Sequence, residues 1–420
     1  MTRGQDDAPT RLARRLGTFD AVMIGLGSMI GAGVFAAFGP AARAAGNGLL
    51  LGLSIAAVVA YCNATSSAAL AAVYPESGGT YVYGRKRLGP FWGFLAGWGF
   101  VAGKLASCAA MAMTFGAYAA PSAARPLAIA AVVALTGVNL LGVQKTAGLT
   151  KLIVATVLAA LAVAVGSSWL GGATDLRRLW PPSTSAHGVA ESAGFLFFAF
   201  AGYARLATLG EEVVEPGRTI PRAIPLALGI TFVVYAIVAL TVLAGAATPA
   251  IAASPAPLAT AVEAGRLAWL SPIVRIGASV ASLGALLSLI VGVSRTAFAM
   301  ASRHDLPAFL SAVHPRYRVP HRAEIAAGSI AVVVVALGDV RAAIGFSSFT
   351  VLIYYAIANA SAWTLERERR RWARALALVG FCGSLALAVT LPLSSIVAGA
   401  GVLAAGALTY SIRRAGSRAR

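Results

Sequence analysis

Charged residues are scarce in this chain of 420 residues. Asp, Glu, Lys and Arg together make up 12% of it, whereas a soluble domain carries about 25%. Hydrophobic residues reach 58%, and they gather in blocks of about 20, the length that crosses the hydrocarbon core of a bilayer. This composition excludes a soluble globular protein and predicts an all-α protein that crosses the membrane many times.

Cysteine and histidine are also rare. The three cysteines lie in apolar blocks without the spacing of a metal or redox motif. The four histidines fall between the blocks, and no Gly-Lys-Ser/Thr nucleotide-binding sequence occurs. We therefore expect no metal site, no cofactor and no enzymatic activity. Residues 1–19 are polar and basic and precede a full-length apolar block, so we also expect no cleavable signal peptide.

Twelve transmembrane helices are predicted, separated by turn-forming or charged segments. They span 19–43, 48–73, 91–119, 126–143, 150–170, 190–212, 223–246, 268–299, 323–339, 343–364, 373–390 and 393–411. Most of the 34 Lys and Arg residues then fall on one side of the membrane. The positive-inside rule places both tails, 1–18 and 412–420, in the cytoplasm of a multi-pass inner-membrane protein. The scatter of this charge over many loops argues against nucleic acid as a partner.

The first span contains IGLGSMIGAGVF, with glycines at 25, 27, 31 and 33. Each glycine weakens a helix by about 1 kcal/mol relative to alanine. Two interpretations remain open from this stretch alone: a face for close helix packing, or an unwound segment whose backbone binds a ligand. A dinucleotide fingerprint is excluded, because Ile30 stands where a glycine is required.

A second interruption favours the unwound interpretation. The sixth span reads GFLFFAFAGYAR, with Gly202 in its middle. Paired interrupted spans in two halves of a chain indicate a transporter site. The ends of half-helices suit the carboxylate and the ammonium group of a zwitterion. No carboxylate lies deep in any predicted span, which disfavours cationic substrates.

These motifs resemble the amino acid–polyamine–organocation transporter family. The matching strings are GSMIGAGVF (27–35), YPESGGTY (74–81), FFAFAGY (197–203) and TLGEE (208–212), followed by EPGRTIPRAI (215–224). The resemblance implies a LeuT-like five-plus-five inverted repeat with discontinuous helices one and six. The repeats would cover 19–170 and 190–364, and helices eleven and twelve would follow at 373–411.

The resemblance also implies a substrate site on the two interrupted spans. The substrate-binding residues would be Ser28, Met29, Ile30, Gly31, Ala32, Gly33, Phe198, Ala199, Phe200, Ala201 and Gly202. The expected function is secondary active transport of small neutral amino acids by alternating access, with a proton as the coupling ion and sodium as the alternative. An exchanger, a cationic amino acid or polyamine carrier, and a non-transporting amino acid sensor remain open.

Lys104 lies deep in the third span, where an ionisable residue is a functional hypothesis by default. It is a candidate for ion coupling; structural binding of carbonyl groups and snorkelling to an interface are the alternatives. Some family members carry a lysine in span five, but Val157 stands at that position, so Lys151 is the second candidate. For sodium, Ser279 and Ser282 are candidate ligands.

A cytoplasmic gate is expected just beyond the break in span six. Arg205 follows the break, and Glu211 and Glu212 close the span. The arginine is expected to reach one of these carboxylates or a carbonyl group; an interfacial arginine without a gating role is the alternative. The expected partners of the protein are therefore an amino acid, a coupling ion and membrane lipid.

Overall fold

The computed structural model describes residues 16–31, 33–74, 76, 78–142, 147–180, 185–207, 213–365 and 371–418. Within these ranges the secondary structure is helical, apart from an isolated bridge between Leu16 and Val213. The long helices are α4 (Leu49–Val73), α6 (Pro90–Ala119), α7 (Ala124–Leu140), α8 (Ala147–Leu170), α11 (Pro216–Gly245), α14 (Ser271–Ser302), α15 (His321–Leu337), α16 (Val340–Trp363), α17 (Arg371–Thr390) and α18 (Leu393–Arg418).

Shorter helices complete the chain. The α-helices are α1 (Thr18–Met29), α2 (Gly33–Ala36), α3 (Phe38–Ala45), α5 (Thr80–Arg87), α9 (Ala186–Phe200), α10 (Ala204–Ala207), α12 (Thr248–Ala253) and α13 (Pro257–Glu263). The 3-10 turns are η1 (Gly46–Gly48), η2 (Pro121–Ala123), η3 (Leu176–Leu179), η4 (Ala201–Tyr203), η5 (Ala268–Leu270) and η6 (Ala308–Ser311).

Among the described residues, ten helical segments are long and apolar enough to cross a membrane. The predicted count of twelve is therefore not confirmed, although helices are present at all twelve predicted positions. The two that fall short are α9, with 15 residues, and α15, with 17. The physical reason for α9 is the interruption itself, because the helix ends at Phe200 and the chain enters η4.

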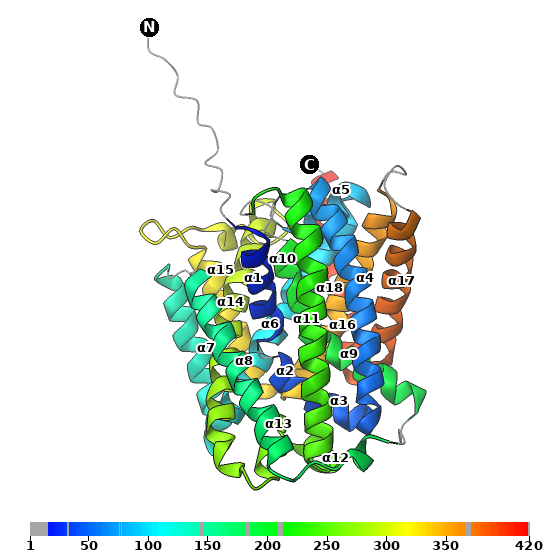
Figure 1. Ribbon diagram of the computed structural model, residues 1–420. Helices are drawn as coiled ribbons and strands as arrows, with labels where there is room; N and C mark the ends of the chain where they lie inside the picture. The colour runs from blue at the N-terminus through cyan, green and yellow to red at the C-terminus, as the bar shows by residue number, and fades with distance from the viewer. Residues whose placement is uncertain are drawn as a thin grey trace.

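The long helices stand side by side as a bundle (Figure 1). The start of α1 and the end of α18 lie at the same end of this bundle, together with α5 (Figure 1). We call this the termini end; α12 and α13 lie at the opposite, far end. Of the interrupted helices, α1 and α10 lie toward the termini end, whereas α2 and α9 lie further toward the far end.

Small residues bring neighbouring helices into close contact around the interrupted pair. A methyl group added at Gly277 of α14 would lie 2.1 Å from the Cβ of Ala160 on α8. One added at Gly103 of α6 would lie 2.1 Å from the hydroxyl oxygen of Thr350 on α16. Apolar transmembrane helices associate through such close packing, since burial from lipid supplies no hydrophobic driving force. These contacts fix the frame that surrounds α1, α2, α9 and α10.

Candidate functional site

The first interruption separates α1 from α2. The amide of Ile30 still donates to the carbonyl of Leu26 at 2.7 Å, which is the last bond of α1. Helix α2 begins only at Gly33. The second interruption separates α9 from α10, with the 3-10 turn η4 between them. Both interrupted helices therefore end inside the bundle, where helix termini leave backbone groups without intrahelical partners.

The two interruptions lie against each other. A Cβ at Gly202 would sit 2.2 Å from the carbonyl oxygen of Ser28 and 2.9 Å from the amide nitrogen of Met29. A Cβ at Gly33 would sit 2.7 Å from the Cα of Ala199. Only glycine fits at either position without movement of a backbone. The chain thus brings two backbones, about 170 positions apart in sequence, into direct contact within the bundle.

The glycines of the first span divide between packing and the interruption. Gly25 faces α10, because an added Cβ would lie 2.6 Å from Leu206. Gly27 faces α8, at 3.0 Å from both Thr150 and Val154. At Gly31 the nearest atom would be the carbonyl oxygen of Gly27, at 3.4 Å, so packing does not require a glycine there. Close helix packing accounts for the first two but not for the glycine at 31.

A tyrosine that sequence reasoning missed joins the two interruptions. The hydroxyl of Tyr235, on α11, donates to the carbonyl of Met29 and lies 3.1 Å from the carbonyl of Ala199. Its ring packs against that of Phe200, with centroids 5.1 Å apart. The side chain is completely buried. One phenol therefore holds a carbonyl from each interrupted helix.

Tyr355, on α16, was missed in the same way. Its hydroxyl lies 3.5 Å from the carbonyl oxygen of Ala201, and its ring is 5.0 Å from that of Tyr203 in η4. A phenol buried in an apolar span must find a partner for its hydroxyl. The position of both tyrosines in the middle of apolar spans could have indicated that their hydroxyls are hydrogen-bonded. That position does not identify the group that each hydroxyl bonds.

The predicted substrate-binding residues gather at this contact. Seven of them are buried: Met29, Ile30, Gly31, Gly33, Ala199, Phe200 and Ala201. Ser28 and Phe198 are half-buried, and the Ser28 hydroxyl donates to the carbonyl of Ile24 at 2.9 Å. Ala32 lies outside the described residues. None of these side chains is charged.

Lys104 points from the middle of α6 and is half-buried. Its ammonium group lies 5.8 Å from the centroid of the Phe100 ring, within range of a cation–π contact. That ring is 5.0 Å from Tyr354, the neighbour of Tyr355. Lys104 makes no ion pair with the described residues. The Phe100 ring therefore lies close both to this lysine and to Tyr354 of α16.

The second coupling candidate has a different environment. Lys151 pairs with Asp20 at 2.9 Å, which joins α8 to the first turn of α1. Both side chains are partly exposed.

Of the gate residues, Arg205 is exposed on α10, whereas the two glutamates predicted with it, Glu211 and Glu212, lie outside the described residues.

The two serines considered for sodium differ in their bonding. The hydroxyl of Ser279 donates to the carbonyl of Arg275 on its own helix, at 2.8 Å. The hydroxyl of Ser282 is buried and has no hydrogen-bond partner among the described residues.

A charged cluster at the termini end was also missed. The hydroxyl of Tyr81 on α5 donates to the carboxylate of Asp305 at 2.6 Å, and Arg85 donates to the same oxygen at 2.7 Å. Arg413 of α18 donates to the Asp305 carbonyl, also at 2.7 Å. Burial, reinforced by the hydrogen bond to Asp305, raises the pKa of Tyr81 to about 12, so the phenol stays a donor at neutral pH. The cluster links α5, α18 and the segment that follows α14.

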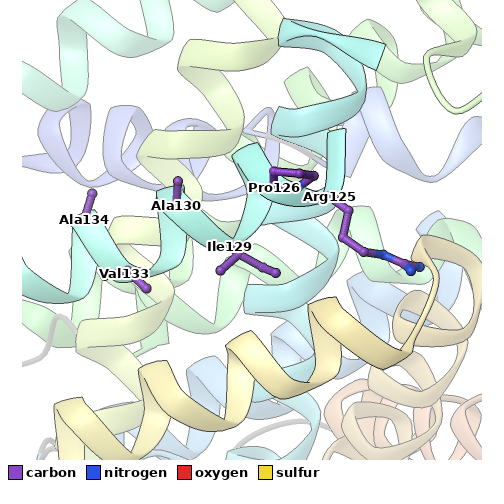
Figure 2. Close-up of a pocket in the computed structure, with 6 residues that line it drawn as sticks. All are labelled: Arg125, Pro126, Ile129, Ala130, Val133 and Ala134. Atoms are coloured by element: carbon purple, nitrogen blue, oxygen red, sulfur yellow. The ribbon is translucent and has the colours of Figure 1, made fainter. Parts of the chain in front are cut away.

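A groove of about 700 Å³ lies elsewhere, on the outer face of α7. Its lining comes from one helix: Arg125, Pro126, Ile129, Ala130, Val133 and Ala134 (Figure 2). Arg125 reaches away from the apolar residues and donates to the carbonyl of Gly338 at 3.2 Å. Val133 is 60% exposed. The groove lacks converging polar groups, so we interpret it as part of the lipid-facing surface and not as a substrate site.

Comparison with known proteins identifies the family. The amino acid permease family model matches residues 20–416. An uncharacterized transporter of Mycobacterium tuberculosis is 60% identical over 410 residues, which cover 97% of this chain and 93% of that protein. The branched-chain amino acid permease BcaP of Bacillus subtilis is 26% identical, covering 74% of this chain and 72% of the permease.

Two further proteins extend this picture. The vacuolar cationic amino acid transporter 4 of Arabidopsis thaliana is 28% identical over 80% of this chain and 60% of its own length. The crystal structure of MhsT in complex with L-phenylalanine has the same fold, with a TM-score of 0.65, 16% identity, and coverage of 93% of this chain and 100% of MhsT. The resemblance seen in the motifs is therefore confirmed, and the chain belongs to the amino acid permease family.

Proposed function

We propose that this permease is a secondary carrier of small neutral amino acids that works by alternating access. The observation that carries the proposal is the contact between the two interruptions, where Gly202 lies against the Ser28 carbonyl. Interrupted helices at the middle of a bundle present amide and carbonyl groups that suit a carboxylate and an ammonium group. A zwitterion is bound there by backbone groups between Ser28 and Gly33 and between Phe198 and Gly202.

The substrate class follows from the side chains around this contact. They are alanine, isoleucine, methionine and phenylalanine, together with Ser28 and Tyr235, whose hydroxyls already donate to backbone carbonyls. This lining suits an apolar or small side chain and offers no counter-ion for a cationic one. The name of the Bacillus relative, a branched-chain amino acid permease, points the same way. The plant relatives are named for cationic amino acids, so a cationic amino acid carrier is the second candidate.

Proton coupling is assigned to Lys104. It is an ionisable side chain at the middle of an apolar span, and such residues mark proton pathways in transporters. Lys151 is the weaker candidate, since its pairing with Asp20 at the start of α1 already accounts for its charge. Sodium coupling through Ser282 is the alternative.

We place the protein in the cytoplasmic membrane with both tails in the cytoplasm, because its basic residues gather in the loops on that side.

Flux into proteoliposomes tests this function. Purified protein is given a panel of labelled amino acids, with proton and sodium gradients imposed separately. Saturable uptake of neutral amino acids that responds to the proton gradient supports the proposal. Uptake only against internal amino acid identifies an exchanger. Binding without any flux identifies a sensor, and a preference for lysine or arginine identifies a cationic carrier.

A further inference from the structure

A small polar cluster lies buried between α4, α16 and α17. Its members are Asn63 of α4, Asn359 of α16 and Ser384 of α17, each with 0% of its surface exposed. The amide nitrogen of Asn359 donates to the side-chain oxygen of Asn63 at 2.7 Å. The amide nitrogen of Asn63 lies 3.0 Å from the Ser384 hydroxyl. Side-chain hydrogen bonds inside the bundle therefore join α4 to α16 and α17, two consecutive helices about 300 positions later in the chain.

The geometry of the cluster is tightly constrained. A Cβ added at Gly380 of α17 would lie 2.7 Å from the side-chain oxygen of Asn359 and 2.8 Å from that of Asn63. Helix α17 thus presses its backbone against both amides. A polar side chain without a partner is costly at membrane depth, and a paired asparagine is known to fix the register of packed helices. The cluster holds α16 at a set height relative to α4.

The cluster is connected to the proposed substrate site through Tyr355. The amide nitrogen of Asn359 also donates to the carbonyl of Tyr355, one turn earlier on α16, at 2.9 Å. The hydroxyl of Tyr355 lies 3.5 Å from the carbonyl oxygen of Ala201, at the interruption of α9. Its ring lies beside Tyr203 in η4. The position of α16 therefore determines where the phenol meets the interrupted helix.

We propose that Asn359, with Asn63 as its partner, is a positioning residue of the substrate site. Its role is to hold the Tyr355 phenol against the Ala201 carbonyl, so that the interruption keeps the shape that binds the amino acid. This inference rests on the proposed function, because it assumes that the interruption binds substrate. Asn359 itself does not touch the substrate.

Substrate affinity of Asn359→Leu tests this role. Leucine has a similar size but cannot donate to Asn63. Loss of one hydrogen bond changes an equilibrium by a factor of about 3 to 10, so we expect the dissociation constant of the best-bound neutral amino acid to rise by that factor. Asn139→Leu is the matched control. Asn139 is equally a buried asparagine in a span, but it donates to the carbonyl of Leu287 on α14 and not to Tyr355.

A double-mutant cycle separates positioning from general stability. Tyr355→Phe removes the hydroxyl that faces Ala201, and is combined with Asn359→Leu. If Asn359 acts through Tyr355, the double variant binds no more weakly than the weaker single variant. The melting temperature of each purified variant is measured in parallel. Asn139→Leu is expected to lower the melting temperature while leaving affinity unchanged.

Three outcomes overturn the inference. In the first, Asn359→Leu binds with wild-type affinity and differs only in melting temperature. In the second, the losses in the double variant add. In the third, Asn139→Leu weakens binding to the same extent. The proposed function fails in a different way, namely when the wild-type protein binds no amino acid at all.

Discussion

Replacing Gly202 with alanine is the sharpest perturbation that the contact between the two interruptions allows. The added methyl carbon would lie 2.2 Å from the Ser28 carbonyl oxygen, whereas ordinary contact begins at 3.4 Å, so the backbones must separate by about 1.2 Å. The atoms that the methyl group would meet belong to the backbone, so they cannot rotate away as the end of a flexible side chain can. Overpacking of this kind costs about 1–3 kcal/mol, and displacement of binding groups by about 1 Å costs up to about a hundredfold in function.

We therefore expect Gly202→Ala to weaken amino acid binding by about 10- to 100-fold. The assay is equilibrium binding of a labelled amino acid to purified protein, with the melting temperature recorded for each variant. Gly229→Ala on α11 is the control, because a methyl group there meets no atom within 4 Å. Wild-type affinity in a folded Gly202→Ala protein would refute the account of two interruptions in contact at the substrate site.

Three further perturbations test other parts of the account. Tyr235→Phe keeps the ring but removes the hydroxyl bound to a carbonyl of each interruption, so affinity should fall about 3- to 10-fold; unchanged affinity would contradict the bridging role. Lys104→Met should abolish accumulation driven by a proton gradient while exchange of labelled for unlabelled amino acid continues; retained accumulation in proteoliposomes removes Lys104 from coupling. Asp305→Asn removes the negative charge from the acceptor shared by Arg85 and Tyr81, so the free energy of unfolding should fall by about 1.5–3 kcal/mol. The melting temperature should fall accordingly, and an unchanged melting temperature would refute this role.

Hydrophobic block length was enough to locate the helices. The predicted spans 48–73 and 91–119 correspond to α4 (Leu49–Val73) and α6 (Pro90–Ala119). The interruption predicted around Gly202 is the 3-10 turn η4. These features are local, because they depend on apolar length and on the low helix propensity of glycine.

The partners of individual side chains could not be predicted in this way. The hydrogen bond from Tyr235 to Met29 joins residues 206 positions apart, and the amide pair of Asn63 and Asn359 spans 296 positions. Such contacts depend on how each helix is rotated toward its neighbours, which a uniformly apolar block does not specify. The same reason explains why Gly25 and Gly31 looked alike in sequence, although an added Cβ would approach a neighbouring helix more closely than 3.0 Å only at the first of the two.

The central claim is that the backbone of the two interruptions binds the two charged groups of an amino acid. Determining the structure of the protein with a bound neutral amino acid tests it most directly. The account predicts that the carboxylate and the ammonium group lie within hydrogen-bonding distance of backbone groups between Ser28 and Gly33 and between Phe198 and Gly202. A bound amino acid held elsewhere, or held there by charged side chains, would contradict it.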